Sequence, residues 1–233
     1  MKLLVVIPAY NEEESLPGVI ADLTDCCPHY DYLVVNDGST DGTAALCEEK
    51  GYNMLDLPVN LGLAGAFQAG LLYAWERGYD AAIQFDADGQ HLACHVQPLA
   101  EKLAEGYDIV IGSRFVTVKK PFTLRMVGSF LISFAMRIAT RQRICDPTSG
   151  MRVFNRAMIG KFSNNLNYPP EPDTISYLLR CGAKICEVQV DVAERTAGQS
   201  YFTLLKSASY MVYTSVSILL VQWFRKNDLK EES

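Results

Sequence analysis

The sequence has little of what several large classes of protein require. Its 233 residues include 16 glycines and 10 prolines without an internal repeat, which excludes collagen-like and low-complexity chains. The 7 cysteines form no CxxC pair, which argues against a disulfide scaffold and favours a reducing cytoplasm. Charged residues make up 21% and hydrophobic residues 49%, so we expect one folded domain with a small appendage.

Positive charge is also scarce overall, but it is concentrated in one segment. The formal charge of -6 and the pI of about 5.1 argue against nucleic-acid binding through overall positive charge. Residues 109–145 nevertheless contain seven basic residues and no acidic one. We therefore expect one local surface of the protein to meet anions.

Zinc binding is disfavoured by the spacing of its candidate ligands. His91, Cys94 and His95 are close in sequence, but a fourth ligand at suitable spacing is missing. The cysteines are interpreted as ordinary thiols of a folded core.

Short β-branched runs alternate with amphipathic stretches in the first half of the chain. The predicted strands cover residues 3–7, 32–36, 81–85 and 108–111, and the predicted helices cover residues 15–26, 41–50, 64–77 and 96–105. This alternation predicts an α/β fold with a mostly parallel, Rossmann-like sheet and helices on both faces. Functional residues are then expected at the carboxyl ends of the strands.

The second half is less regular. A basic, apolar helix is predicted at residues 121–140, a loop at 146–150, and short strands at 151–154 and 184–190. Residues 207–224 then carry no formal charge over 18 positions.

This uncharged stretch is at the short limit for a membrane span, which needs about 20 residues. Tyr210, Thr214 and Ser217 lie away from its apolar stripe, a pattern typical of an amphipathic helix. We favour a helix in the membrane interface or against a partner over a spanning helix, and a buried core helix is the third alternative.

The strongest local motif is FDADGQH, which directly follows a predicted strand. Asp86, Asp88 and the amide oxygen of Gln90 can converge on a hard cation such as Mg²⁺ or Mn²⁺. An Asp-rich turn with solvated carboxylates is the alternative.

Two further polar loops follow predicted strands at residues 8–13 and 35–42. Each could be a turn that leads into a helix and its cap. Because the loops follow parallel strands, we expect them to line one rim of the sheet together with the FDADGQH loop.

Seven segments of the chain occur in the order typical of one enzyme family. They are PAYNEE (8–13), VVNDGSTDGT (34–43), NLGLAGAFQAG (60–70), FDADGQH (85–91), GSRF (112–115), DPTSGMRVF (146–154) and ERxxGxS (194–200). With them the chain resembles family 2 glycosyltransferases of the GT-A fold, and specifically the branch that makes polyprenyl-phosphate sugars. A dinucleotide-binding interpretation lacks GxGxxG after the first strand.

The resemblance implies a donor site for a nucleotide sugar. The residues implied in nucleotide binding are Pro8, Tyr10, Glu12, Val35, Asp37, Asp86 and Ala87. Asp86, Asp88 and Gln90 would hold Mg²⁺ or Mn²⁺ on the diphosphate, where the ion offsets charge on the departing nucleoside diphosphate. Arg195 matches a family arginine near the diphosphate, in a loop that closes over the donor.

The resemblance also implies a site for a lipid phosphate. Arg114, Arg125 and Ser129 match family positions associated with the acceptor phosphate. Arg125 and Ser129 are four residues apart and share a helix face, and a guanidinium fork suits a phosphate. A basic helix face that only attracts anionic lipid is the alternative.

A lipid monophosphate is mostly dianionic at pH 7, because its second pKa is near ~6, so it needs less help from a base than a sugar hydroxyl does. Asp146 is the expected base or orienting carboxylate, with Glu171 and Asp173 as rivals and a turn role for Asp146 as the alternative. Family 2 implies inversion by direct in-line displacement.

The chain departs from the family pattern at three points. Tyr201 stands where Lys is common, and Ala64 stands where close relatives tend to have Gly. The glycine-rich segment lacks a common Lys, which favours UDP-glucose or UDP-N-acetylglucosamine over a mannose donor.

The predicted enzyme is a metal-dependent glycosyltransferase at the cytoplasmic face of a bacterial membrane. Residues 1–200 would form the GT-A domain, with 121–140 as an interfacial helix, and residues 201–233 a helix and tail associated with a membrane or partner. The product on undecaprenyl phosphate would serve cell-wall or surface polysaccharide modification. Small enzymes of this type often work beside a small multispanning membrane protein, and a homo-oligomer is a further option.

Two other functions stay open. One is transfer to a sugar hydroxyl or to a lipid-diphosphate-linked oligosaccharide, which would require a true general base. The other is a catalytically silent nucleotide-sugar module that recruits a membrane partner.

Overall fold

The computed structural model describes residues 1–121, 124–165, 171–193 and 204–220, but not the side chains of residues 124, 125, 164, 165 and 204–208. A seven-stranded sheet runs through it in the order β3-β2-β1-β4-β6-β5-β7. The strands are β1 (Leu3–Ala9), β2 (Asp31–Asn36), β3 (Met54–Asp56), β4 (Ala81–Gln84), β5 (Ile109–Ser113), β6 (Arg152–Asn155) and β7 (Ile185–Gln189). Only β6 is antiparallel to its neighbours among these strands, so the mostly parallel sheet is confirmed.

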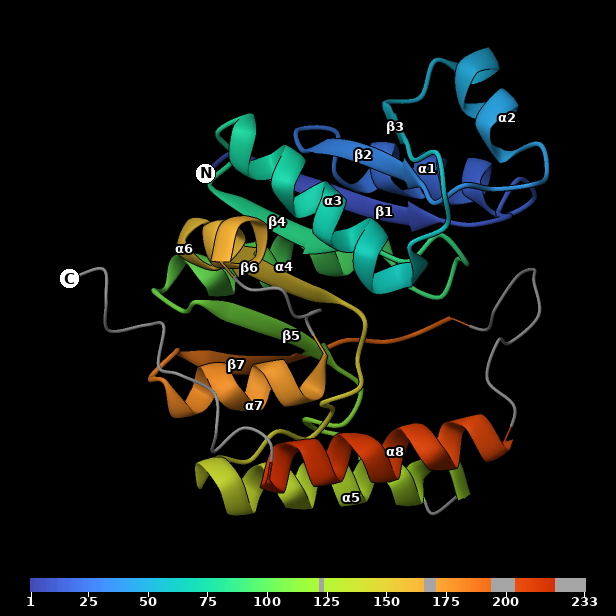
Figure 1. Ribbon diagram of the computed structural model, residues 1–233. Helices are drawn as coiled ribbons and strands as arrows, with labels where there is room; N and C mark the ends of the chain where they lie inside the picture. The colour runs from blue at the N-terminus through green and yellow to red at the C-terminus, as the bar shows by residue number, and fades with distance from the viewer. Residues whose placement is uncertain (122–123, 166–170, 194–203, 221–233) are drawn as a thin grey trace.

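Helices cover both faces of the sheet, as predicted (Figure 1). Side chains of α1 (Leu16–Cys26), α2 (Thr43–Lys50) and α4 (Val96–Ala104) pack in one core, after a short 3-10 turn at Ala93–His95. Side chains of α3 (Gly62–Glu76), α6 (Arg156–Gly160) and α7 (Pro172–Arg180) pack in the other, with a π-helical turn at Lys161–Asn165. Alternate residues of β1 supply the two cores, which explains its unbroken apolar run.

Two helices, α5 (Leu124–Thr140) and α8 (Leu204–Leu219), lie side by side beyond the β7 edge of the sheet (Figure 1). They pack against each other and against α7. On α8 the hydroxyl residues Thr214 and Ser217 are buried, whereas Val212 and Val216 are exposed. The amphipathic pattern is therefore present, and its polar side faces the protein. No helix within the described residues is long and apolar enough to cross a membrane.

Several boundaries differ from the predictions. The three-residue strand β3 and helix α7 were not predicted, because β3 is too short for a period-2 pattern and α7 follows a proline-rich segment. Helix α5 begins at Leu124 rather than at residue 121, and α8 begins at Leu204 rather than at 207. The expected boundary between residues 200 and 201 lies outside the described residues.

Candidate active site

The loops after β1 and β2 meet at the carboxyl edge of the sheet. The backbone N–H of Asp37 donates to the carbonyl of Ala9 at 2.8 Å. The Asn11 side-chain oxygen accepts from the Thr40 backbone N–H at 2.8 Å, and Asn11 adopts a φ of 57° that asparagine tolerates. The structure therefore joins the first two polar loops, as the parallel strands predict.

Asp37 is fixed at the centre of this rim. Its side chain is 2% exposed, and its Oδ1 atom accepts from the Leu61 backbone N–H at 2.7 Å. The next residue, Gly38, has a φ of 64°, and a Cβ there would lie 2.8 Å from the backbone N of Asn60. The loop after β2 and the start of α3 are thus held in close contact, which leaves Asp37 in one orientation.

The other nucleotide-binding candidates surround this point. Pro8 and Val35 are register partners on β1 and β2, and both are buried. Ala87 is also buried, and Tyr10 is half-buried. The carboxylate of Glu12 accepts a hydrogen bond from the Ser15 hydroxyl at 2.6 Å. These residues lie at or beside the carboxyl ends of β1, β2 and β4, where the donor site is predicted.

Asp86 and Asp88 follow β4 beside His91. The His91 Nδ1 atom accepts from the Asp86 backbone N–H at 2.9 Å, which places the proton of a neutral ring on Nε2. That Nε2 lies 3.6 Å from Asp86 Oδ2, and Gln84 donates to Asp86 Oδ1 at 3.1 Å. Asp88 Oδ1 accepts from the Gln90 backbone N–H at 3.0 Å, so the loop itself positions both carboxylates.

The donor set of this loop fits a hard cation. Asp86 and Asp88 offer carboxylate oxygens, and the side chain of Asp86 is 29% exposed. Within the described residues no group of three His, Cys, Asp or Glu side chains could hold an ion alone. The remaining oxygens would come from the Gln90 amide, from water and from a bound diphosphate, which is how Mg²⁺ sites with one or two carboxylates are usually completed.

A cavity of about 490 Å³ lies next to Asp86. Gly150 lines it, and a Cβ at Gly150 would lie 2.8 Å from Asp86 Oδ2. The other lining residues that the argument uses are Arg114, Ser129, Arg152, Glu171 and Tyr210. They come from the loop after β5, from α5, β6 and α8, and from the residue before α7, so the cavity joins the sheet edge to the α5 and α8 pair.

Arg114 and Asp146 form a bidentate ion pair in the wall of this cavity. Arg114 Nε donates to Asp146 Oδ2 at 2.7 Å, and a terminal guanidinium nitrogen donates to Oδ1 at 2.9 Å. Asp146 is fully buried, and its hydrogen bond to Arg114 raises the pKa of the arginine. Glu187 accepts from the Asp146 backbone N–H at 2.7 Å. Both oxygens of Asp146 are thus committed to Arg114.

Lys120 was not singled out from the sequence, yet it reaches the same wall. Its ammonium donates to the Ser129 hydroxyl at 2.6 Å and to the Cys145 carbonyl at 3.0 Å. Burial lowers the pKa of Lys120, Asp146 opposes that shift, and Arg114 adds to it. The basic run before α5 was the available signal, but spacing alone does not tell an inward lysine from a solvated one.

Arg152 and Tyr210 are two further cavity residues that sequence reasoning missed. Arg152 donates to the Pro147 carbonyl at 2.7 Å, and burial lowers the pKa of Arg152 while Glu171 opposes the shift. The Tyr210 hydroxyl donates to the Glu171 carboxylate, and burial, followed by Glu171, raises the pKa of Tyr210. The signal for Arg152 was a charged residue inside a predicted strand.

Not every predicted residue can be placed. The side chain of Arg125 and all of Arg195 lie outside the described residues. Asp173, one of the rival bases, accepts from the Ser217 hydroxyl at 2.9 Å and is absent from the cavity lining. Glu171 is the rival that does line the cavity.

The mostly parallel sheet, with carboxylates at its rim and a basic cavity beside them, agrees with the family comparison. Residues 4–162 match the model of glycosyl transferase family 2, so the chain belongs to that family.

Curated relatives narrow the resemblance. Undecaprenyl-phosphate mannosyltransferase of Micrococcus luteus is 35% identical over 86% of this chain and 87% of its own length. Polyprenol monophosphomannose synthase of Mycolicibacterium smegmatis is 32% identical over 85% of this chain and 80% of its own.

A solved structure shares the fold. Glucosyl-3-phosphoglycerate synthase of Mycobacterium tuberculosis, crystallised with Mn²⁺, UDP and phosphoglyceric acid, matches with a TM-score of 0.69 at 21% identity. The match covers 97% of this chain and 80% of that one.

Proposed function

We propose that this glycosyltransferase moves one sugar from a nucleotide donor to a polyprenyl phosphate at a membrane surface. The observation that carries the proposal is the cavity beside Asp86, which is basic at Arg114 and Arg152 and is closed by helices α5 and α8. A donor diphosphate on the carboxylate side and a lipid phosphate on the arginine side would meet there. The two polyprenyl-phosphate relatives support this acceptor class.

On the donor side, Asp37 and the loop after β1 bind the nucleotide, and Asp86, Asp88 and Gln90 would hold the metal ion. A bound Mg²⁺ or Mn²⁺ supplies Lewis-acid stabilisation of the departing nucleoside diphosphate. His91 and Gln84 orient Asp86 by the contacts described above. We retain Arg195 as a proposed diphosphate contact on the strength of its motif.

On the acceptor side, Arg114 and Ser129 bind the lipid phosphate, together with Arg125. The dianionic phosphate attacks the anomeric carbon in line with the departing diphosphate, with inversion. Asp146 is better suited to position Arg114 than to accept a proton, because Arg114 already occupies both of its oxygens. Transfer to a sugar hydroxyl would need a base, and Glu171 is the described cavity carboxylate that could serve.

The sugar we propose is mannose. The expected UDP-glucose or UDP-N-acetylglucosamine donor rested on the fit of Asp37 and its loop to a uracil and on one missing lysine, and the two relatives reported above argue against it.

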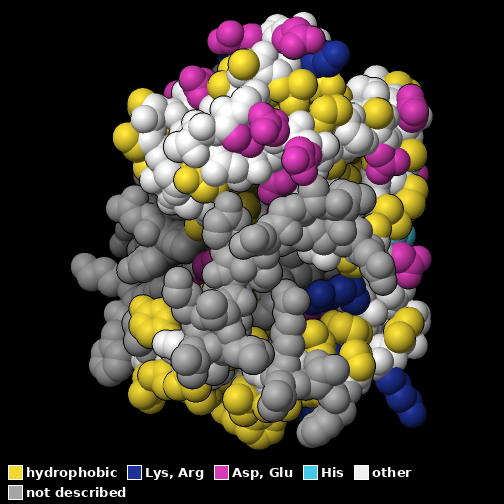
Figure 2. All heavy atoms as spheres, turned by 90° about the vertical axis from the view of Figure 1, so that its right-hand side faces the viewer, with side chains coloured by type: hydrophobic (Ala, Val, Ile, Leu, Met, Phe, Trp, Pro, Cys, Tyr) yellow, Lys and Arg dark blue, Asp and Glu magenta, His cyan; other side chains and the backbone are white. Residues whose placement is uncertain are grey.

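We further propose that the exposed apolar residues of α5 and α8 lie on the cytoplasmic face of a membrane. Phe134 on α5 is 63% exposed, and Val212 on α8 is 58% exposed. Figure 2 shows hydrophobic side chains gathered at the lower end of the molecule, where these two helices lie, and acidic side chains mainly at the opposite end. A multispanning partner or a second copy of the chain would have to share this surface.

The test is nucleoside diphosphate release from GDP-mannose, UDP-glucose and UDP-N-acetylglucosamine, with and without undecaprenyl phosphate and Mn²⁺ or Mg²⁺. We expect lipid- and metal-dependent turnover of GDP-mannose, lost in Asp88→Asn and kept in Asp80→Asn at the opposite end of β4. Turnover of a UDP-sugar would overturn the choice of sugar. Donor binding without turnover on any lipid would favour the silent binding module.

A further inference from the structure

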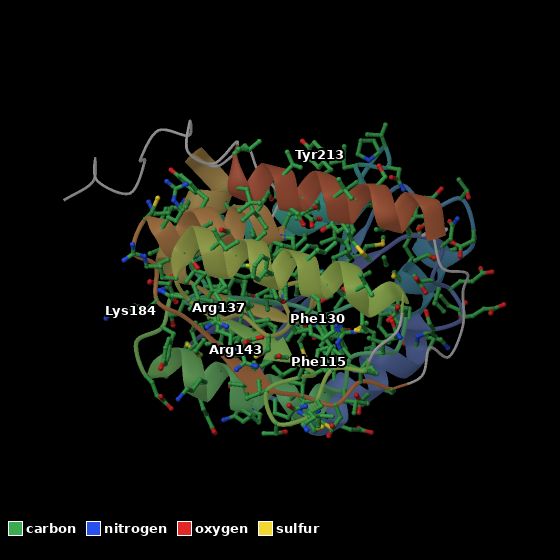
Figure 3. The ribbon with its side chains drawn as sticks, turned by 90° about the horizontal axis from the view of Figure 1, so that it is seen from below. Phe115, Phe130, Arg137, Arg143, Lys184 and Tyr213 are labelled. Atoms are coloured by element: carbon green, nitrogen blue, oxygen red, sulfur yellow. The ribbon has the colours of Figure 1, made fainter. Side chains whose placement is uncertain are left out.

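A second hollow, here called the basic-aromatic groove, is lined by Lys120 and shares no lining residue with the active-site cavity. Its volume is about 510 Å³. The loop after β5, helix α5 and the segment after α5 line it. The residues that the argument uses are Phe115, Phe130, Ser133, Phe134, Arg137 and Arg143. Figure 3, seen from below, shows Phe115, Phe130, Arg137 and Arg143 gathered from these segments while Lys184 lies apart.

The side chains that line the groove carry positive charge only. Four cations line it, namely Lys119, Lys120, Arg137 and Arg143, and no carboxylate does. In the described part of the chain none of the four forms an ion pair. Asp146 and Glu187 lie near enough to Lys120 to oppose the fall in its pKa, but neither lines the groove. A protein with a formal charge of -6 thus keeps one hollow lined by cations alone, which suits an anionic occupant.

The walls of the groove are apolar and aromatic. The Lys120 ammonium lies 5.1 Å from the ring centroid of Phe115 and 5.1 Å from that of Phe130, so cation–π contacts hold the rings around the charge. Phe134 stands at the edge and belongs to the exposed apolar face of α5. An occupant therefore needs an anionic group for the arginines and an apolar part that continues onto that face.

One polar group in the groove lacks a partner. The hydroxyl oxygen of Ser133 is buried and makes no hydrogen bond with any described residue. A buried hydroxyl without a partner costs free energy unless a ligand satisfies it. It lies on α5 one turn before Arg137, on the same helix face, so one phosphate could contact both side chains.

We propose that the basic-aromatic groove binds the phosphate of an anionic membrane phospholipid, with its acyl chains directed along Phe130 and Phe134. Arg137 and Arg143 contact the phosphate oxygens, and Ser133 donates its hydroxyl proton to one of them. This site is separate from the acceptor site, because the two hollows share no lining residue; the Lys120 to Ser129 hydrogen bond joins a residue of one to a residue of the other. The lipid would fix the orientation of the enzyme on the membrane without taking part in sugar transfer.

The test uses dihexanoylphosphatidylglycerol below its micelle concentration, titrated into the full chain by calorimetry or NMR. We expect saturable binding that weakens about 10-fold or more in Arg137→Gln/Arg143→Gln, because charge-assisted hydrogen bonds are lost. Lys184→Gln, a charge removed elsewhere on the same side of the molecule, should change it less than about 2-fold. Equal weakening in both variants would mean general surface charge and would overturn the proposal.

Further titrations distinguish a phospholipid from other ligands that carry a phosphate. Dihexanoylphosphatidylcholine and glycerol phosphate should bind at least about 10-fold more weakly, and a match by glycerol phosphate would make the groove a free-phosphate site. Competition by undecaprenyl phosphate would make it part of the acceptor site and overturn the separate assignment. Ser133→Ala should weaken phosphatidylglycerol binding without lowering thermal stability, because the wild-type hydroxyl has no partner to lose.

The proposal for the groove rests on the proposed function only for the membrane location, and experiments can contradict either proposal without the other. The titration needs no turnover, so a chain that transfers no sugar can still show the site. Conversely, turnover of a soluble short-chain polyprenyl phosphate should stay within about 2-fold of wild type in Arg137→Gln/Arg143→Gln. A larger loss would place these arginines in acceptor binding instead.

Discussion

Polar and apolar side chains are distributed in opposite ways in two regions of the molecule. One region is the sheet edge around β1, β2 and β4, and the other is the helix pair α5 and α8. At the sheet edge the strands are buried, and polar residues such as Asp37 and Asp86 come only where each strand ends. On the helix pair the polar residues Ser129 and Thr214 are buried, while large apolar residues such as Phe134 and Val216 are exposed. The difference fits the proposed function, in which the first region binds a water-soluble donor and the second meets an apolar surface.

The cavity is the place where the two regions meet. Asp86, which follows β4, lies next to the lining residue Gly150. The basic lining residues are Arg114 in the loop after β5 and Arg152 on β6, and Ser129 and Tyr210 line the cavity from α5 and α8. In the proposed function, a water-soluble nucleotide sugar enters from the first region and a membrane lipid from the second. Substitutions in one region at a time separate the effects on donor binding, acceptor binding and membrane binding.

The largest effect is expected on the donor side. Asp86→Asn or Asp88→Asn removes a carboxylate from the proposed metal site, and turnover should fall by about 1000-fold or more. Chelation with EDTA should have the same effect on the wild type and be reversed by Mn²⁺. Retained turnover in both variants would contradict the proposed role of a metal ion in the reaction.

A smaller but large effect is expected at the ion pair of the acceptor side. Arg114→Lys keeps the charge but loses the fork, so turnover should fall by about 100-fold, mostly through a higher KM for the lipid. In Asp146→Asn, turnover should fall by a similar factor, and the pH profile of turnover should be unchanged. The double variant should be no worse than Arg114→Lys alone, because Asp146 acts through Arg114. Additive losses, or a lost limb of the pH profile, would instead make Asp146 a base.

An intermediate effect, on stability, is expected where the two helices close the cavity. Tyr210→Phe leaves the Glu171 carboxylate without its donor, and the free energy of unfolding should fall by about 1 to 3 kcal/mol in a urea titration. The raised pKa of Tyr210 also means that the folded chain keeps this proton after the unfolded chain loses it above pH ~10. Stability should therefore decline above that pH, and less steeply in the phenylalanine variant.

The smallest effect on the fold is expected at the exposed apolar face. Phe134→Ser and Val216→Gln should change the free energy of unfolding by no more than about 0.5 kcal/mol, because both side chains are exposed in the isolated chain. Co-sedimentation with vesicles should nevertheless fall severalfold in each. Val59→Gln, an equally exposed change near the end of β3, is the matched control and should leave vesicle binding unaltered.

The sheet edge could be predicted from the sequence, and the helix pair could be predicted only in part. The buried run of β1 and the DADGQH turn after β4 are local signals, because strand ends and polar turns follow each other along the chain. The pattern of α8 predicted two faces but not which one is buried, since Thr214 and Ser217 would ordinarily be placed in water. Partners such as Asp146 for Arg114, or Glu171 for Tyr210, are far apart in sequence, so only the fold pairs them.

The most direct test that the lipid acceptor binds where the helix pair meets the sheet edge is photo-crosslinking. The probe is a polyprenyl phosphate that carries a photoreactive group in its first isoprene units. The labelled peptides would be identified by mass spectrometry, with and without excess unlabelled lipid. We expect labelling on α5 and α8, around residues 126–134 and 210–220, that unlabelled lipid prevents. This labelling should be reduced in Arg114→Lys. Competed labelling confined to residues 43–61, or none on these two helices, would contradict this expectation.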